Sequence, residues 1–182
     1  QQKELMILGK NNKKFSEMKP IFIVGVPRCG STLIEKVIAS GPLSIPIGEE
    51  TGAISYYVAE KILAKKSIKT DIENIYNNIM ERYHLLNLIN KEKNYIFTDK
   101  SLDNFFFIGL IKEIFPKAKI INCKRNSTSS IISIFKNNLG DVSWAHDLKN
   151  IFQYFDIYHK KISEFKKMFP KFIYDVQLES FI

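Results

Sequence analysis

The sequence predicts an α/β domain in which helices flank a central parallel sheet, in a P-loop-like arrangement. Short apolar runs rich in β-branched residues alternate with longer segments of helical periodicity. The first run, residues 21–24, leads through a glycine-bounded loop into a helix that begins near Ser31. A cation follows each of the first three runs, namely Arg28, Lys100 and Arg125. Because parallel strands end at the same edge of a sheet, these cations predict an anion site at that edge.

Apolar spacing and breaker residues define each element in order. The expected strands are residues 21–24, 95–98, 119–123 and 172–176. Six helices are expected. The first begins at Ser31 and the second covers residues 51–65. The third has Asp71 as its N-cap and runs to residue 89, and the other three cover residues 102–115, 126–138 and 147–169. Pro116 and Pro170 end two of these helices, because proline lacks the backbone N–H that a helix needs. Residues 41–48 and 141–144 are expected to form loops.

The composition indicates one globular domain. The chain has 182 residues, of which 45% are hydrophobic, and this is enough to bury a core. Its 27 Lys and Arg residues against 19 Asp and Glu favour anionic ligands, although scattered surface lysines explain the excess equally well. No run reaches the roughly 18 consecutive apolar residues of a membrane span, and no signal-peptide pattern opens the chain. We expect no membrane span, and we interpret residues 1–19 as a polar N-terminal lead-in.

No metal site is expected. The two cysteines, Cys29 and Cys123, are too few for a disulfide scaffold or a zinc site, and the three histidines do not group with acidic residues. A phosphatase-like nucleophile at Cys29 would need an arginine six positions later, where Glu35 stands and would repel phosphate. Cys29 is instead expected to contribute a small side chain and a backbone N–H group.

The loop after the first strand has the spacing of an ATP-binding loop but not its lysine. Gly25, Gly30 and Thr32 match the pattern G-x-x-x-x-G-K-[ST], and Ser31 occupies the lysine position. Arg28 provides a cation inside the loop instead. This change favours a phosphorylated donor other than a nucleoside triphosphate. Two alternatives remain open: a P-loop nucleotide kinase or other NTP-using enzyme, and a non-catalytic basic module that binds nucleic acid or an acidic partner.

Residues 27–33 resemble the first signature of the PAPS-dependent sulfotransferases, P-[RK]-[SC]-G-[ST]-[ST]. Their form here is similar to that of the protein-tyrosine sulfotransferases and of the bacterial sulfotransferases with tetratricopeptide repeats. In that family the loop binds the 5′-phosphosulfate of 3′-phosphoadenosine 5′-phosphosulfate (PAPS). The resemblance implies donor contacts from the whole stretch, which comprises Pro27, Arg28, Cys29, Gly30, Ser31, Thr32 and Leu33.

Three further segments resemble motifs of the same family. After the third strand, Arg125 and Ser133 have the family's eight-residue spacing, which implies that they bind the 3′-phosphate of PAPS. Residues 98–105 resemble the D-K-x-P-x-N-F stretch, which implies that Lys100 lies near the bridging oxygen of the donor. Residues 48–51 resemble G-E-E-T, which implies that Glu50 is the catalytic base, with Glu49 as the alternate.

The resemblance implies transfer of a sulfuryl group from PAPS to an acceptor hydroxyl, with no metal. Arg28 and Lys100 would stabilise the charge that moves to the bridging oxygen. The acceptor, a protein tyrosine, a sugar or a small metabolite, stays open. Residues 20–182 would form the sulfotransferase domain, incomplete at its C-terminus because the family continues further, and tetratricopeptide repeats would lie upstream of this chain. The expected location is the cytoplasm, or the Golgi lumen for a eukaryotic protein-tyrosine enzyme.

Overall fold

A computed structural model describes residues 17–64, 72–89, 95–137, 139–140 and 142–181. Four parallel strands form its sheet in the order β2-β1-β3-β4. They are β1 (Ile21–Gly25), β2 (Thr98–Asp99), β3 (Lys119–Lys124) and β4 (Ile173–Gln177). The side chains of residues 22–24 in β1 are fully buried, which explains why that strand is apolar on both faces.

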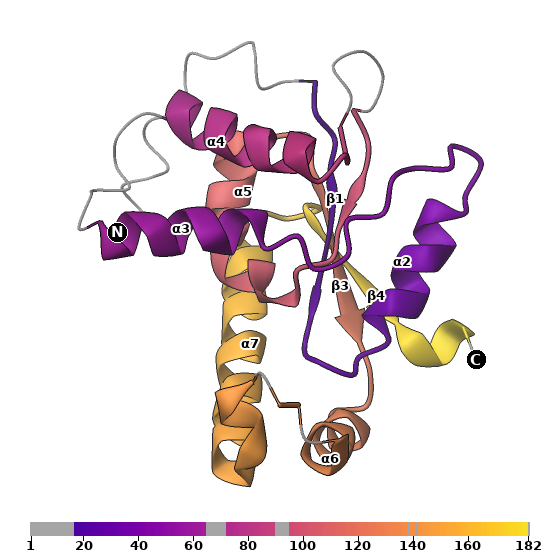
Figure 1. The fold of residues 1–182 in the computed structure, drawn as a ribbon. Coiled ribbons are helices and arrows are strands. Elements are labelled where there is room, and N and C mark those ends of the chain that lie inside the picture. The colour runs from indigo at the N-terminus through magenta and orange to yellow at the C-terminus, as the bar shows by residue number, and fades with distance from the viewer. Residues whose placement is uncertain (1–16, 65–71, 90–94, 138, 141, 182) are drawn as a thin grey trace.

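Helices cover both faces of the sheet, as the sequence predicts. The α-helices are α2 (Ser31–Ala39), α3 (Ala53–Leu63), α4 (Ile72–Leu85), α5 (Ile108–Ile114), α6 (Ser127–Asn137) and α7 (Leu148–Met168). Short 3₁₀ segments are η2 (Leu102–Phe107), η3 (Ser143–His146) and η4 (Leu178–Phe181). Figure 1 shows α3, α4, α5 and α7 on one side of the sheet and α2 on the other, with α6 beyond the C-terminal end of β3. The expected P-loop-like α/β fold is thus confirmed.

Two expected elements differ from the structure in a way that matters for the site. The second strand is only Thr98–Asp99, although Phe97 just before it still accepts a hydrogen bond from Ile21 N of β1 at 2.8 Å. The expected helix over residues 102–115 begins as the 3₁₀ segment η2, and regular α-helix starts only at Ile108. Helix α4 ends at Leu85 rather than at residue 89, and the expected N-cap Asp71 lies outside the described residues.

Aromatic rings pack tightly on the face of the sheet that α4 and α5 cover. The ring centroids of Tyr83 and Phe97 are 4.8 Å apart, and those of Phe22 and Phe115 are 5.9 Å apart. All four side chains are fully buried. Contacts of this kind contribute both buried apolar area and favourable ring geometry. They give the strand ends a rigid base, and the strand ends carry the polar residues described next.

Candidate active site

A cavity of about 500 Å³ lies where the C-terminal ends of the strands meet the loops that follow them. Arg28 follows β1, Lys100 follows β2 and Arg125 follows β3, and all three line this cavity. The full lining comprises Pro27, Arg28, Gly30, Ser31, Thr32, Glu50, Lys100, Leu102, Arg125, Leu139 and Val142. The three cations therefore meet at one edge of the sheet, as the sequence predicts.

The loop between β1 and α2 depends on its two glycines. A Cβ atom on Gly25 would lie 2.7 Å from Cys29 Sγ and 3.0 Å from the backbone oxygen of Cys123. Gly30 has a φ of +86°, and a Cβ atom there would lie 2.5 Å from Leu178 Cδ1. Helix α2 begins directly after Gly30, and its first two residues, Ser31 and Thr32, line the cavity, so the N-terminus of the helix lies there. This arrangement favours a bound anion at the helix N-terminus.

Two residues of the loop signature do not reach the cavity. The Cys29 side chain is fully buried against Gly25, and burial excludes it from contact with a ligand unless the loop moves. The hydrogen bond between the two thiols raises the pKa of Cys123 and lowers that of Cys29. Leu33 is on the outer side of α2 with 44% of its surface exposed. Neither side chain belongs to the cavity lining, so a donor contact from Cys29 or Leu33 would have to come from the backbone.

Arg28, Arg125 and Ser133 form a connected cluster. The Nε of Arg28 donates to Ser133 Oγ at 3.1 Å, although the two residues are 105 positions apart. A terminal nitrogen of Arg125 donates to the backbone oxygen of Arg28 at 3.0 Å. The resemblance implied that Arg28 binds the 5′-phosphosulfate and that the other two residues bind the 3′-phosphate. The two hydrogen bonds connect Arg28 to both residues of the predicted 3′-phosphate site.

Lys100 and the acidic pair lie together on the other side of the cavity. Lys100 is only 3% exposed, and its Nζ is 2.9 Å from Glu49 Oε1 and 3.7 Å from Glu50 Oε1. The hydrogen bond from Lys100 lowers the pKa of Glu49. Of the two carboxylates, only Glu50 lines the cavity. A carboxylate that holds a short bond to a lysine is a weaker base, so the geometry separates the two candidates.

The segment that carries the acidic pair runs beside β2, and an isolated parallel bridge pairs Glu49 with Lys100. Thr98 N donates to Pro46 O at 3.0 Å, and Lys100 N donates to Gly48 O at 2.9 Å. The Thr98 hydroxyl accepts from Gly48 N and donates to Glu35 Oε1 at 2.6 Å. These bonds fix the position of Glu49 and Glu50 along β2, beside Lys100. Glu35, which the sequence analysis considered only as an obstacle to phosphate, is a buried acceptor that holds Thr98 in place.

Asp99 is a site residue whose role the sequence analysis missed. Its carboxylate is fully buried and accepts five hydrogen bonds: two from Ser101, and one each from Asn104, Thr51 and Tyr83. Burial raises the pKa of Asp99, and these bonds oppose that rise. The network ties α3, α4 and η2 to the end of β2. A polar residue directly after a buried strand was the available signal, because such a residue must find its partners inside the protein.

The sequence analysis also missed the apolar part of the cavity. Leu102, Leu139 and Val142 belong to its lining. Val142 N donates to Leu139 O at 2.9 Å, which closes a turn after α6. No periodic pattern marks these positions, because they lie in a 3₁₀ segment and in a loop. They give the cavity one apolar wall beside its cationic floor.

The described residues hold no cluster of His, Cys, Asp and Glu that would ligate a metal ion. Within the same residues, no helix combines the length and the apolar character needed to cross a membrane.

The parallel sheet and the glycine-bounded loop define a P-loop-like α/β domain, with a cation-lined cavity at one edge of the sheet. A sequence model described as "Sulfotransferase family" matches residues 20–182. The chain belongs to the sulfotransferase family.

Individual relatives are distant. An uncharacterized protein of Aquifex aeolicus (strain VF5) is 27% identical over 177 residues, which cover 88% of this chain. The chain spans only 23% of that protein's length. The crystal structure of a sulfotransferase from Alicyclobacillus acidocaldarius superposes with a TM-score of 0.56 at 17% identity, and covers 90% of this chain and 74% of that one. A shikimate kinase from Bacteroides thetaiotaomicron is a weaker match, with a TM-score of 0.42 at 14% identity over 87% of this chain and 86% of that one.

Proposed function

We propose that this protein transfers a sulfuryl group from PAPS to the hydroxyl of an acceptor. The observation that carries the proposal is the meeting of Arg28, Lys100 and Arg125 with the N-terminus of α2 in one cavity. Three fixed cations and a helix N-terminus suit a ligand with several anionic groups. Family membership supports sulfuryl transfer in general. Family membership does not identify the donor or the acceptor, and both are therefore part of this proposal.

The side chains that face the cavity fit a doubly phosphorylated adenosine. The loop backbone with Ser31 and Thr32 would hold the 5′-phosphosulfate, at the N-terminus of α2. Arg125 would hold the 3′-phosphate together with Ser133, which is not part of the cavity lining but accepts a hydrogen bond from Arg28 Nε. Arg28 would contribute between the two because it contacts both residues. PAPS supplies the sulfuryl group. Residues of this chain would bind the donor, accept the proton and stabilise the leaving group.

Glu50 would serve as the base. Its carboxylate lines the cavity and would accept the proton of the acceptor hydroxyl as that oxygen bonds to sulfur. The bond between sulfur and the bridging oxygen breaks in the same step, which leaves 3′,5′-adenosine bisphosphate. Lys100 would neutralise the charge that develops on the bridging oxygen, and burial strengthens its effect. Glu49 would orient Lys100 through its 2.9 Å bond.

The donor site is tested by ligand-dependent stability. Saturating 3′,5′-adenosine bisphosphate, at about 100 times its Kd, should raise the free energy of unfolding by about 2.7 kcal/mol. Adenosine 5′-monophosphate should stabilise less, since it lacks the 3′-phosphate. Arg125→Ala should reduce the difference between the two ligands. The matched control, Lys149→Ala, removes an exposed cation of α7 away from the cavity and should leave that difference unchanged.

Two outcomes would contradict the donor assignment. Stronger stabilisation by ATP with Mg²⁺ than by the bisphosphate would indicate an NTP-using enzyme. Tight, steeply salt-dependent binding of RNA or DNA without any response to the bisphosphate would indicate a nucleic-acid-binding module. The base assignment is tested separately: Glu50→Gln should lower turnover with little change in bisphosphate affinity. A Glu50→Gln protein that turns over normally while Glu49→Gln does not would transfer the role to Glu49.

A further inference from the structure

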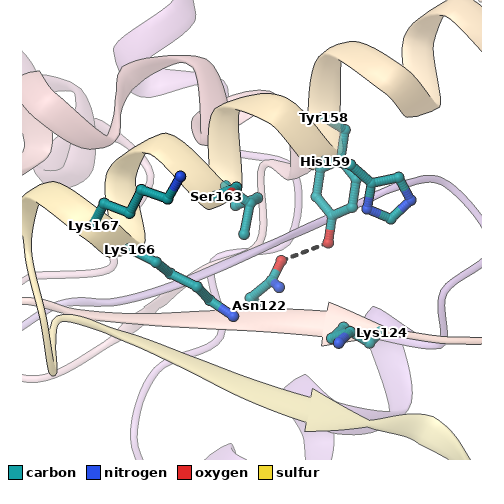
Figure 2. A pocket seen from close by; sticks show the side chains of 8 residues that line it. Asn122, Lys124, Tyr158, His159, Ser163, Lys166 and Lys167 are labelled. Atoms are coloured by element: carbon teal, nitrogen blue, oxygen red, sulfur yellow. Dashed lines mark hydrogen bonds between the residues drawn. The ribbon is translucent and has the colours of Figure 1, made fainter.

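A second cavity, of about 400 Å³, lies between α7 and the sheet and shares no lining residue with the active-site cavity. Figure 2 shows it from close by. Two residues of β3 line one side, and six residues of α7 line the other; the lining comprises Asn122, Lys124, Tyr158, His159, Ile162, Ser163, Lys166 and Lys167. Its volume falls in the range of small-molecule sites, roughly 300–1,000 Å³.

The floor of this cavity, which we call the α7 cleft, is polar and fixed. Tyr158 OH donates to Asn122 Oδ1, and Asn122 Nδ2 donates to Asp175 Oδ1 at 2.9 Å. Asn122 is 2% exposed and Tyr158 is 3% exposed. A buried polar pair of this kind must be satisfied internally, and here each partner holds the next in place. The α7 cleft therefore has a preformed floor rather than one that a ligand would have to order.

The α7 cleft has an excess of positive charge. Lys166 and Lys124 both pair with Asp175, the latter at 3.5 Å. Burial alone would raise the pKa of Asp175, but the hydrogen bonds from Asn122 and Lys166 outweigh it and lower the pKa, so the aspartate is ionised. Among the described residues, no carboxylate lies within 4.0 Å of the Lys167 amine. Because Lys124 and Lys166 share one aspartate and Lys167 has no such partner, the three lysines and Asp175 together carry a net charge of +2.

We propose that the α7 cleft binds a dianionic phosphate or sulfate group, either free or esterified to a small molecule. A net charge of +2 matches a dianion, and lysine ammonium groups bind phosphate as point charges. The hydroxyl of Ser163, at the centre of the lining, is available as a neutral donor beside them. This site is independent of the proposed sulfuryl transfer, because no residue of the donor site belongs to it.

Calorimetric titration tests the α7 cleft with two probes, inorganic phosphate and glucose 6-phosphate, and with glucose as the uncharged control. Both phosphates should bind, glucose should not, and the tighter phosphate identifies the free or the esterified source. The double variant Lys124→Ala with Lys167→Ala should weaken binding at least tenfold, because it removes two cations of the lining. Lys166 stays unchanged, so that its pairing with Asp175 is kept. Higher salt should weaken binding as well.

The matched control is Lys149→Ala with Lys160→Ala, which removes the same charge from exposed positions of α7 outside the cleft. It should change the affinity less than twofold. Equal losses in the two double variants, binding of glucose, or no binding of either phosphate would overturn the proposal. Phosphate binding that disappears in Arg125→Ala but survives in Lys124→Ala with Lys167→Ala would place the anion in the active-site cavity instead. A cleft that binds phosphate while 3′,5′-adenosine bisphosphate has no effect would reject the proposed donor and keep this inference.

Discussion

Substitution of Gly30 by alanine should destabilise the protein for two separate reasons. The residue has a φ of +86°, a conformation that costs an L-residue roughly 1–2 kcal/mol. A Cβ atom there would also lie 2.5 and 2.7 Å from the two methyl carbons of Leu178. Leu178 is only 7% exposed, so its side chain must shift within a buried position, and this adds the roughly 1–3 kcal/mol that is typical of overpacking. Together they predict a loss of about 2–5 kcal/mol in the free energy of unfolding.

The chain provides a matched control in Gly52. Like Gly30, Gly52 directly precedes a helix and has a positive φ, here +56°. The nearest atom to a Cβ added at Gly52, however, would be Ser55 Oγ at 3.6 Å. Gly52→Ala should therefore lose only the conformational part, roughly 1–2 kcal/mol. Urea unfolding of both variants measures the difference. Equal losses would refute the steric argument. In a double-mutant cycle, Leu178→Ala should relieve part of the cost of Gly30→Ala, with a coupling of 0.5 kcal/mol or more.

Three further predictions concern buried or paired carboxylates, each measured by urea unfolding. Burial raises the pKa of Glu35 in the folded state. The free energy of unfolding of the wild type, relative to that of Glu35→Gln, should therefore fall as pH rises through that raised pKa. A difference between the two proteins that grows in favour of the wild type with rising pH would contradict this. The hydrogen bond from Lys100 lowers the pKa of Glu49 in the folded state. The wild type should therefore be more stable than Glu49→Gln near neutral pH, and this extra stability should be lost as pH falls through the lowered pKa. A difference in stability that does not depend on pH would contradict this. Asp99→Ala should cost about 3–5 kcal/mol, because it leaves several buried donors without an acceptor, whereas Asp99→Asn should cost less; equal costs would show that side-chain volume alone matters.

The parts of the site that the sequence predicted are those set by short-range geometry. Gly25 and Gly30 mark the loop, because a strand, a tight turn and a helix within some 20 residues leave few alternatives. Arg28, Lys100 and Arg125 were expected to meet because each directly follows a strand, and parallel strands share one C-terminal edge. Neither inference needs knowledge of which side chains pack together. Both therefore follow from strand order and spacing alone.

The parts that could not be predicted depend on partners far away in the chain. Arg28 was assigned by its position in the loop, but Ser133, 105 residues later, determines where its guanidinium lies. The loop signature predicted a small side chain at Cys29, but not that this side chain would be enclosed by Gly25 and by Cys123, 94 residues later. A local pattern fixes the path of the backbone, and each side chain then takes the direction that packing and hydrogen bonding allow. The consequence for Arg28 is specific: because one residue bonds to α6 and also belongs to the loop before α2, an anion bound near α6 would act on the conformation of that loop.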